Sequence, residues 1–222
     1  MTSDNIHYII PARKGSKGLP FKNRKLLPYT LDTLPSSVFN RLTITTDDEV
    51  ILKECAHRNL NYIVRPSSLS GDTVSPKAVM VHCVESLAIN PDDIVVLLYL
   101  TYPQRSWAMI ESIQKVFIDN NLKSLLCKKQ PDTHPYLCFY DNEAGSPSQI
   151  ISHDLYRRQD YPPCFELSFY ACMFKARELP SLGNNMFNED TFFFPLEDHL
   201  DIDTIEDFFK FKEANEFRKN NS

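Results

Sequence analysis

Residues 94–100 read Ile-Val-Val-Leu-Leu-Tyr-Leu, an uninterrupted run of apolar and aromatic side chains. A strand with one face in water alternates apolar and polar residues, whereas a continuous apolar run is typical of a strand covered on both faces. Strands of that kind occur in parallel sheets that have helices packed on each side. The run therefore predicts an α/β fold.

The sequence on both sides of this run alternates strand-like and helix-like segments. Further strands are predicted at residues 6–10, 41–46, 61–64, 122–127, 136–140, 168–174 and 191–194. Helices are predicted from a cap at Thr46 through about residue 57, from residue 76 onward, at about 106–119 and at about 204–217. Their starts are marked by Thr46-x-x-Glu49, Ser75-Pro76 and Thr204-x-x-Asp207. The alternation predicts three layers around a mostly parallel central sheet.

Length and composition limit the classes of protein to consider. The 222 residues are 42% hydrophobic, so they fit one domain with a substantial core. A formal net charge of −5 argues against a nucleic-acid partner, and no apolar run is long enough to predict a membrane span. The polar N-terminus does not resemble a signal peptide, and the six cysteines form no C-x-x-C pair. We expect free thiols and a cytoplasmic location.

A basic loop follows the first predicted strand. Residues 11–23 read Pro-Ala-Arg-Lys-Gly-Ser-Lys-Gly-Leu-Pro-Phe-Lys-Asn and contain two of the chain's five glycines, Gly15 and Gly18. Glycine lets the backbone approach a ligand closely, and Arg or Lys side chains bind phosphate oxygens. The spacing fits neither the dinucleotide fingerprint nor the P-loop. The loop is a candidate phosphate site, and the alternative is a solvated basic turn.

A pair of carboxylates near the C-terminus is the second candidate. In a strand, Asp201 and Asp203 would project to the same side and Ile202 into the core. Two carboxylates beside bound phosphate groups suit Mg²⁺. The alternative is that Asp203 only favours the start of the following helix.

Five segments in order resemble the CMP-acylneuraminate and CMP-Kdo cytidylyltransferases. They are residues 12–23, Ile44-Thr-Thr-Asp-Asp-Glu49, Arg65-Pro-Ser-Ser-Leu-Ser-Gly-Asp-Thr73, Leu98-Tyr-Leu-Thr-Tyr-Pro-Gln-Arg105 and Asp201-Ile-Asp-Thr204 with Asp207. The resemblance covers nearly the whole chain. It implies a Rossmann-like nucleotidyltransferase fold and a reaction in which CTP activates a 2-keto-3-deoxy sugar acid, releasing pyrophosphate.

The resemblance also implies roles for individual residues. Arg13, Lys22, Asp201 and Asp203 would be catalytic, and the two aspartates would bind Mg²⁺. The nucleotide would be bound by Ala12, Arg13, Ser16, Lys17, Lys22, Asn23, Arg65, Asp72, Thr73 and Ser75. The sugar acid would be bound by Tyr99, Thr101, Arg105, Arg158 and Gln159. For Arg65 the alternative is a surface ion pair, for Asp72 a loop or helix-start role, and for Arg158 a structural ion pair.

The acceptor half departs from the family. Tyr99 and Tyr102 replace the usual Gln and Ser, and Leu137 stands where Lys is common. These changes indicate an acid other than N-acetylneuraminate. Family members commonly form homodimers, so we expect a homodimer with an irregular acceptor and dimerisation region at about residues 130–170. Two alternatives stay open: a nucleotidyltransferase for another sugar or polyol, and a non-catalytic nucleotide-binding protein.

Overall fold

The chain folds around a seven-stranded sheet in the order β3-β2-β1-β4-β8-β5-β9. The computed structural model describes residues 5–141, 145–197 and 199–220. The sheet strands are β1 (Ile6–Pro11), β2 (Leu42–Thr46), β3 (Asn61–Val64), β4 (Ile94–Leu97), β5 (Ser124–Lys129), β8 (Glu166–Lys175) and β9 (Phe192–Pro195). Strand β8 is antiparallel to β4 and β5, and the other neighbouring pairs are parallel. The predicted mostly parallel sheet is confirmed.

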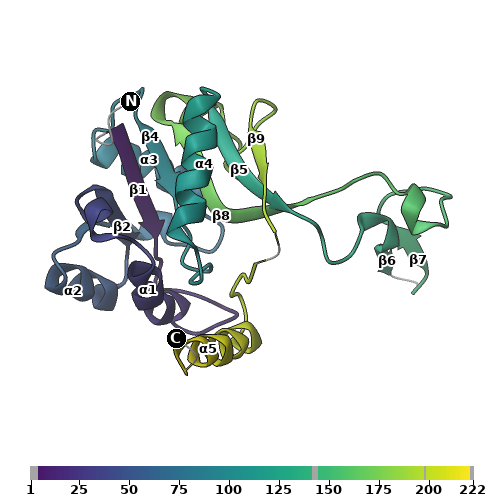
Figure 1. The fold of residues 1–222 in the computed structure, drawn as a ribbon, viewed down its shortest axis with the longest axis horizontal. Helices are drawn as coiled ribbons and strands as arrows, with labels where there is room; N and C mark the ends of the chain where they lie inside the picture. Colours follow the sequence, from purple (N-terminus) through teal and green to yellow (C-terminus); the bar gives the residue numbers. More distant parts are fainter. Residues whose placement is uncertain (1–4, 142–144, 198, 221–222) are drawn as a thin grey trace.

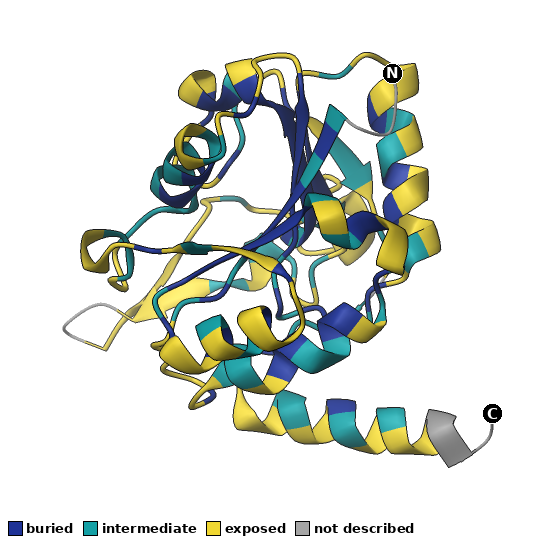
Figure 2. Cartoon of the chain, turned by 90° about the vertical axis from the view of Figure 1, so that its left-hand side faces the viewer, coloured by how far each residue is buried: buried dark blue, intermediate teal, exposed yellow. Residues whose placement is uncertain are grey.

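Helices cover both faces of the sheet, which gives the three predicted layers. One face carries α1 (Lys22–Asp32), α2 (Glu49–His57), α4 (Trp107–Asp119) and α5 (Ile205–Asn220). The other face carries α3 (Pro76–Ser86) and the 3-10 helix η6 (Ala176–Ser181). The remaining 3-10 helices of the described residues are η2 (Ser36–Arg41), η3 (Ser67–Leu69), η4 (Pro135–Leu137) and η5 (Arg158–Asp160). Figure 2 shows the strands buried in the centre and the helices exposed on their outer sides.

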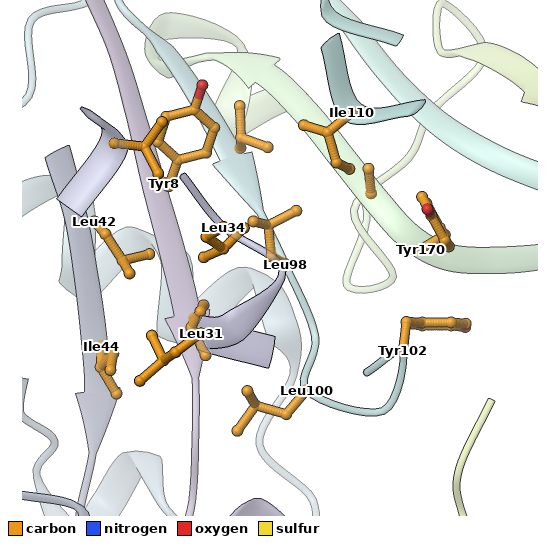
Figure 3. Packing of buried hydrophobic residues seen from close by; sticks show 14 of the residues in the cluster. Tyr8, Leu31, Leu34, Leu42, Ile44, Leu98, Leu100, Tyr102, Ile110 and Tyr170 are labelled. Carbon is orange, nitrogen blue, oxygen red and sulfur yellow. The ribbon is translucent and has the colours of Figure 1, made fainter. Parts of the chain in front are cut away.

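Alternation along β1 divides the core in two. Tyr8 and Ile10 pack with α1, α2 and α4, whereas Ile9 packs with α3 on the opposite face. The first of these clusters continues past β4 through Leu100 to Tyr102, which lies at its edge (Figure 3). Burial on both faces explains why β4 carries no polar side chain. The loop after β4 is therefore anchored by core packing where it leaves the sheet.

Several local predictions were wrong. Helix α1 was not predicted, although Leu26, Leu27 and Leu31 bury one of its faces. Helix α2 is capped by Asp48, whose carboxylate accepts from the Val50 N–H, and not by Thr46. The Thr46 hydroxyl instead donates to the Ala12 carbonyl and joins β2 to the segment after β1.

The strand predicted at residues 136–140 is observed only at its end. That region forms η4 and then β6 (Phe139–Asp141), which pairs with β7 (Pro147–Gln149) in a separate two-stranded sheet. Figure 1 shows this hairpin at the end of an arm that projects away from the central sheet. The arm falls within the region at about residues 130–170 that was expected to be irregular.

Two further features concern the cysteines and the apolar character of the helices. All six cysteines are free thiols, in agreement with the expectation. None of the helices in the described ranges combines the length and the apolar character that crossing a bilayer requires.

Candidate active site

A cavity of about 410 Å³ opens at the carboxyl ends of the parallel strands. Its lining comes from the loop after β1, from Arg65 directly after β3, from residues 99–102 after β4, and from the segment that precedes α5. Ligands of open α/β sheets bind at this edge, because the loops that follow adjacent parallel strands converge there. The cavity is therefore the candidate site.

The basic loop supplies one wall of the cavity. Arg13, Ser16, Lys22 and Asn23 all line it. The Asn23 amide donates to the Arg13 carbonyl at 2.8 Å and ties the start of α1 to the loop. The Lys14 N–H donates to the Asp47 carboxylate at 2.7 Å, which fixes the loop against the end of β2. The loop is anchored at both points, which differs from a freely solvated basic turn.

Gly18 has a steric reason to be glycine. A Cβ atom at this position would lie well under 3.0 Å from the Asp203 carbonyl oxygen, closer than real Cβ atoms approach. The loop and the Asp201–Asp203 segment are thus packed backbone against backbone. This contact brings residues that are far apart in sequence to the same side of the cavity.

Arg65 places a buried positive charge in the cavity wall. The residue is 5% exposed, and its Nη2 donates to the Thr45 carbonyl at 2.8 Å. Burial lowers the pKa of its guanidinium. Within the described ranges it forms no ion pair with a carboxylate, so the surface ion pair considered from the sequence does not form. A fixed cation of this kind suits a ligand that offers carbonyl or anionic oxygens.

The two aspartates also line the cavity, in different environments. The Lys22 Nζ pairs with Asp203 Oδ1 at 2.6 Å, and the Asp203 side chain is 70% exposed. Burial raises the pKa of the Asp201 carboxyl. The Tyr102 hydroxyl donates to Asp201 Oδ2 at 2.7 Å.

The segment that carries the aspartates is not the predicted strand. Its backbone meets the loop after β4 through one hydrogen bond, from the Ile202 N–H to the Thr101 carbonyl at 2.8 Å. Ile202 is nevertheless fully buried, and Asp201 and Asp203 both line the cavity. The predicted placement of the three side chains is observed without the strand.

The donor set fits a divalent cation. Carboxylate oxygens are preferred ligands of Mg²⁺ and similar hard cations. Asp201 Oδ1 is buried and has no hydrogen-bond partner among the described residues, which leaves an acceptor unfilled. No cluster of three or more His, Cys, Asp or Glu side chains forms a complete protein cage in the described part of the chain. The arrangement suits a cation that takes its remaining ligands from a substrate.

Several predicted nucleotide-binding residues lie outside the cavity lining and support it instead. Asp72 pairs with Arg13 and, at 2.8 Å, with Lys17. Hydrogen bonds from Lys17 and Arg13 hold the pKa of Asp72 below its usual value. Ser75 caps α3 by accepting from the Ala78 N–H at 3.2 Å. Three further residues occupy other positions: Ala12 is buried beside β2, and Lys17 and Thr73 are exposed.

The predicted acceptor residues are divided between the cavity and other regions. Tyr99 and Thr101 line the cavity. Arg105 does not: it is 2% exposed and donates to the carbonyls of Tyr170 and Tyr99 at 2.9 and 2.8 Å. Burial lowers the pKa of Arg105 to about 10. The prediction that Arg105 binds the sugar acid is therefore corrected, because these hydrogen bonds direct its guanidinium into the core.

Arg158 and Gln159 lie in η5, on the projecting arm, and both are exposed. Neither belongs to the cavity lining of its own chain. The ion pair formed nearby on the arm uses Arg157, whose guanidinium pairs with Asp160 at 2.7 Å.

The sequence reasoning missed part of the cavity wall. Tyr102 and Phe169 line it, and the Phe169 ring meets the Tyr99 ring edge-on at 5.5 Å between centroids. Tyr102 could have been identified, because it stands in the recognised segment after β4. The others missed are Val74, Pro76, Val79, Met80, Leu100 and Asn185. Asn185 follows η6 in a segment without any sequence signal.

Comparisons with known proteins identify relatives of this chain. The sequence model of a family described as "Cytidylyltransferase" matches residues 7–164. An N-acylneuraminate cytidylyltransferase of Streptococcus agalactiae serotype V is 26% identical over 212 residues, which cover 90% of this chain and 51% of that protein. A pseudaminic acid cytidylyltransferase of Campylobacter jejuni is 31% identical over 145 residues, which cover 61% of this chain and 62% of that protein. This chain spans about half the length of the first of these relatives.

A solved structure shares the fold. The CMP:2-keto-3-deoxy-manno-octonic acid synthetase complexed with CTP superposes with a TM-score of 0.63 at 14% identity. The match covers 96% of this chain and 99% of that one. The three-layer arrangement around the central sheet is therefore shared over almost the whole chain.

Proposed function

The chain belongs to the cytidylyltransferase family, and on this premise we propose that it transfers the CMP group of CTP to a 2-keto-3-deoxy sugar acid. One observation carries the proposal. Three cations, Arg13, Lys22 and Arg65, line a single cavity together with Asp201 and Asp203. A triphosphate needs such cations, and a divalent cation beside it needs such carboxylates.

The nucleotide would be bound between the basic loop and Arg65. Arg13 and Lys22 would contact phosphate oxygens, and Ser16 at the cavity wall would donate to the same group. The Asn23 amide nitrogen already donates to Arg13, so its carbonyl oxygen is the atom oriented to accept from the cytosine amino group or a ribose hydroxyl. Asp72 would act by holding Arg13 and Lys17 rather than by contacting the ligand.

The reaction exchanges one P–O bond for another. The anomeric hydroxyl of the acid attacks the α-phosphorus of CTP and releases its proton to water, the bond from the α-phosphorus to the oxygen that bridges it to the β-phosphate breaks, and pyrophosphate leaves. Arg13 and Lys22 would neutralise charge that develops on the leaving group. Asp201 and Asp203 would hold a divalent cation, for which we propose Mg²⁺, and its Lewis acidity would lower the pKa of the attacking hydroxyl.

Lys22 links the two halves of this site. It is paired with Asp203 at 2.6 Å. An incoming triphosphate offers Lys22 a second anionic partner, and a cation on Asp203 would weaken the existing pair. Lys22 is therefore positioned to move from the carboxylate to the phosphate as substrate binds. We assign no separate general base.

The acceptor site would be completed by a second copy of the chain. Arg158 lies on the projecting arm and outside its own cavity. A two-stranded hairpin is marginally stable alone, and this arm exposes several large apolar side chains, including Tyr156 at 87%. In a homodimer these residues would be covered, and Arg158 would reach the partner's cavity and pair with the carboxylate of the acid. The reaction is assigned to the cytoplasm, where thiols such as these six remain reduced.

Mixing two inactive variants tests this arrangement. Arg158→Ala removes the arm cation, and Asp201→Asn removes a carboxylate of the cavity. In a mixed dimer, one site would combine the intact Asp201 of the first subunit with the intact Arg158 of the second, so activity should return. Activity that stays absent in confirmed mixed dimers would show that Arg158 does not act across subunits.

The reaction itself is tested by pyrophosphate release. CTP with Mg²⁺ is offered N-acetylneuraminate, Kdo, legionaminate and pseudaminate in turn, and ATP, GTP and UTP serve as controls. We expect release with CTP and one acid. The changes at Tyr99, Tyr102 and Leu137 predict that this acid is not N-acetylneuraminate. If CTP protects the fold against heat without release for any sugar acid, the proposed activity is wrong and a binding role is favoured.

A further inference from the structure

The Tyr102 hydroxyl joins three separate segments at the cavity wall. It donates to Asp201 Oδ2 at 2.7 Å and accepts from the Phe169 N–H at 3.2 Å. Tyr102 itself follows β4, Phe169 belongs to β8, and Asp201 lies before α5. The Ser168 side chain on β8 also interacts with this hydroxyl. Contacts with a donor and an acceptor in different segments fix its orientation.

The ring that carries this hydroxyl is held rigidly. Tyr102 is 4% exposed and lies at the edge of the packed core (Figure 3). Its ring centroid lies 5.8 Å from that of Tyr170 and 5.3 Å from that of His199, and the Arg105 guanidinium lies 5.8 Å from it. A buried ring with neighbours on several sides has little rotamer freedom, so the hydroxyl is a fixed point.

The orientation of the Asp201 carboxylate depends on the Tyr102 hydroxyl. The backbone near it is outside any strand and contacts the loop after β4 through the single Ile202–Thr101 hydrogen bond. That bond and the burial of Ile202 set the backbone position, and the Thr101 side chain also interacts with the Asp201 carboxylate. The Tyr102 hydroxyl engages Oδ2, and Oδ1 stays without a partner in the described residues.

We propose that Tyr102 is the positioning residue for Asp201: its hydroxyl holds the carboxylate in the one rotation that leaves Oδ1 available to the divalent cation. This inference rests on the proposed function, because it assigns Asp201 to that cation. It gives a role to a tyrosine that stands where the family's segment commonly has serine. A purely structural tyrosine would stabilise the fold without affecting the cation.

Tyr102→Phe removes the hydroxyl and keeps the ring. The matched control is Tyr170→Phe in the same ring cluster, where the hydroxyl accepts from the Ser106 N–H at 2.8 Å and does not contact Asp201. Tyr102→Phe loses its hydrogen bonds with Asp201 and Phe169, and Tyr170→Phe loses the one with Ser106, so a general loss of stability affects both variants. Folding of each is checked by circular dichroism and thermal melting.

The measured quantity is the affinity of the full chain for Mn²⁺. It is determined by electron paramagnetic resonance with CTP present and without the sugar acid. Loss of a group that orients a metal ligand weakens metal binding by about 10- to 100-fold. We expect an effect of this size for Tyr102→Phe, and Tyr170→Phe should match the unsubstituted chain. Equal affinity in Tyr102→Phe, or an equal loss in both variants, would overturn the proposal.

Asp201→Asn separates failure of this inference from failure of the proposed function. If Asp201→Asn binds Mn²⁺ as tightly as the unsubstituted chain, Asp201 is not a ligand, and the proposed cation site fails together with this inference. If Asp201→Asn weakens binding, adding Tyr102→Phe to it should cause no further loss, because Tyr102 acts only through Asp201. A further loss in the double variant would contradict the positioning role.

Discussion

Gly18→Ala perturbs the site without removing any functional group. The new methyl group would lie well under 3.0 Å from the Asp203 carbonyl oxygen. Gly145 is the glycine with positive φ among the described residues, so backbone strain does not contribute at Gly18. An ordinary contact requires at least 3.4 Å, so the loop and the Asp203 segment must separate by on the order of 1 Å. A shift of this size at a catalytic group costs about 10²-fold in rate.

The assay is kcat/KM for pyrophosphate release with CTP and the active acid. We expect Gly18→Ala to lower it by about 10²-fold and to lower stability by about 1–3 kcal/mol through overpacking. Gly71→Ala is the matched control, because its Cβ would meet the Val74 side chain at an ordinary 3.7 Å and Gly71 lies outside the cavity lining. Full kcat/KM in folded Gly18→Ala would refute the reasoning that this contact sets the position of Asp203.

Three further predictions concern stability and pH. Arg105→Met should cost about 1–3 kcal/mol in urea unfolding because backbone carbonyls lose a donor, with the acceptor KM unchanged; a raised KM at full stability would restore the predicted binding role. Burial raises the pKa of Asp201 because it disfavours the charged carboxylate. The folded state therefore loses stability as the pH rises through that pKa and the buried group ionises. Asp201→Asn should therefore melt higher than the unsubstituted chain at pH 7, with the difference shrinking towards pH 4; an opposite trend would contradict the burial argument. Asp48→Ala should cost about 1–2 kcal/mol, since it removes the α2 cap and the partner of Arg24 at 2.7 Å; unchanged stability would count against the cap.

Local chemistry predicted the helix starts where the partners are close in sequence. Ser75 with Pro76 starts α3 as predicted. The Thr204–Asp207 capping box forms: the Asp207 N–H donates to the Thr204 hydroxyl at 3.2 Å, and the Asp207 carboxylate accepts from the Thr204 N–H at 2.9 Å. Thr46 failed as a cap because its hydroxyl is used by the Ala12 carbonyl, 34 residues away. A local pattern carries no information about such a distant partner.

In the candidate site, too, residues in recognisable sequence segments were predicted, and residues placed by distant partners were not. The basic loop, Arg65 and the aspartate pair were found because each stands in a recognisable segment and comes to the carboxyl edge of the sheet. Asn185 was missed because only the tertiary fold brings it to the cavity. Arg105 was placed in the site by its segment, but its direction into the core depends on carbonyls that β8 and the loop after β4 supply.

The central claim is that the α-phosphate of CTP is transferred to a sugar acid. The most direct measurement offers the full chain CTP labelled with ³²P at the α- or the γ-position, together with Mg²⁺ and each acid in turn. The account predicts that the α-label appears in a product attached to one acid and that the γ-label appears in pyrophosphate. Label from the γ-position in the sugar product, or no labelled sugar product with any acid, would contradict it.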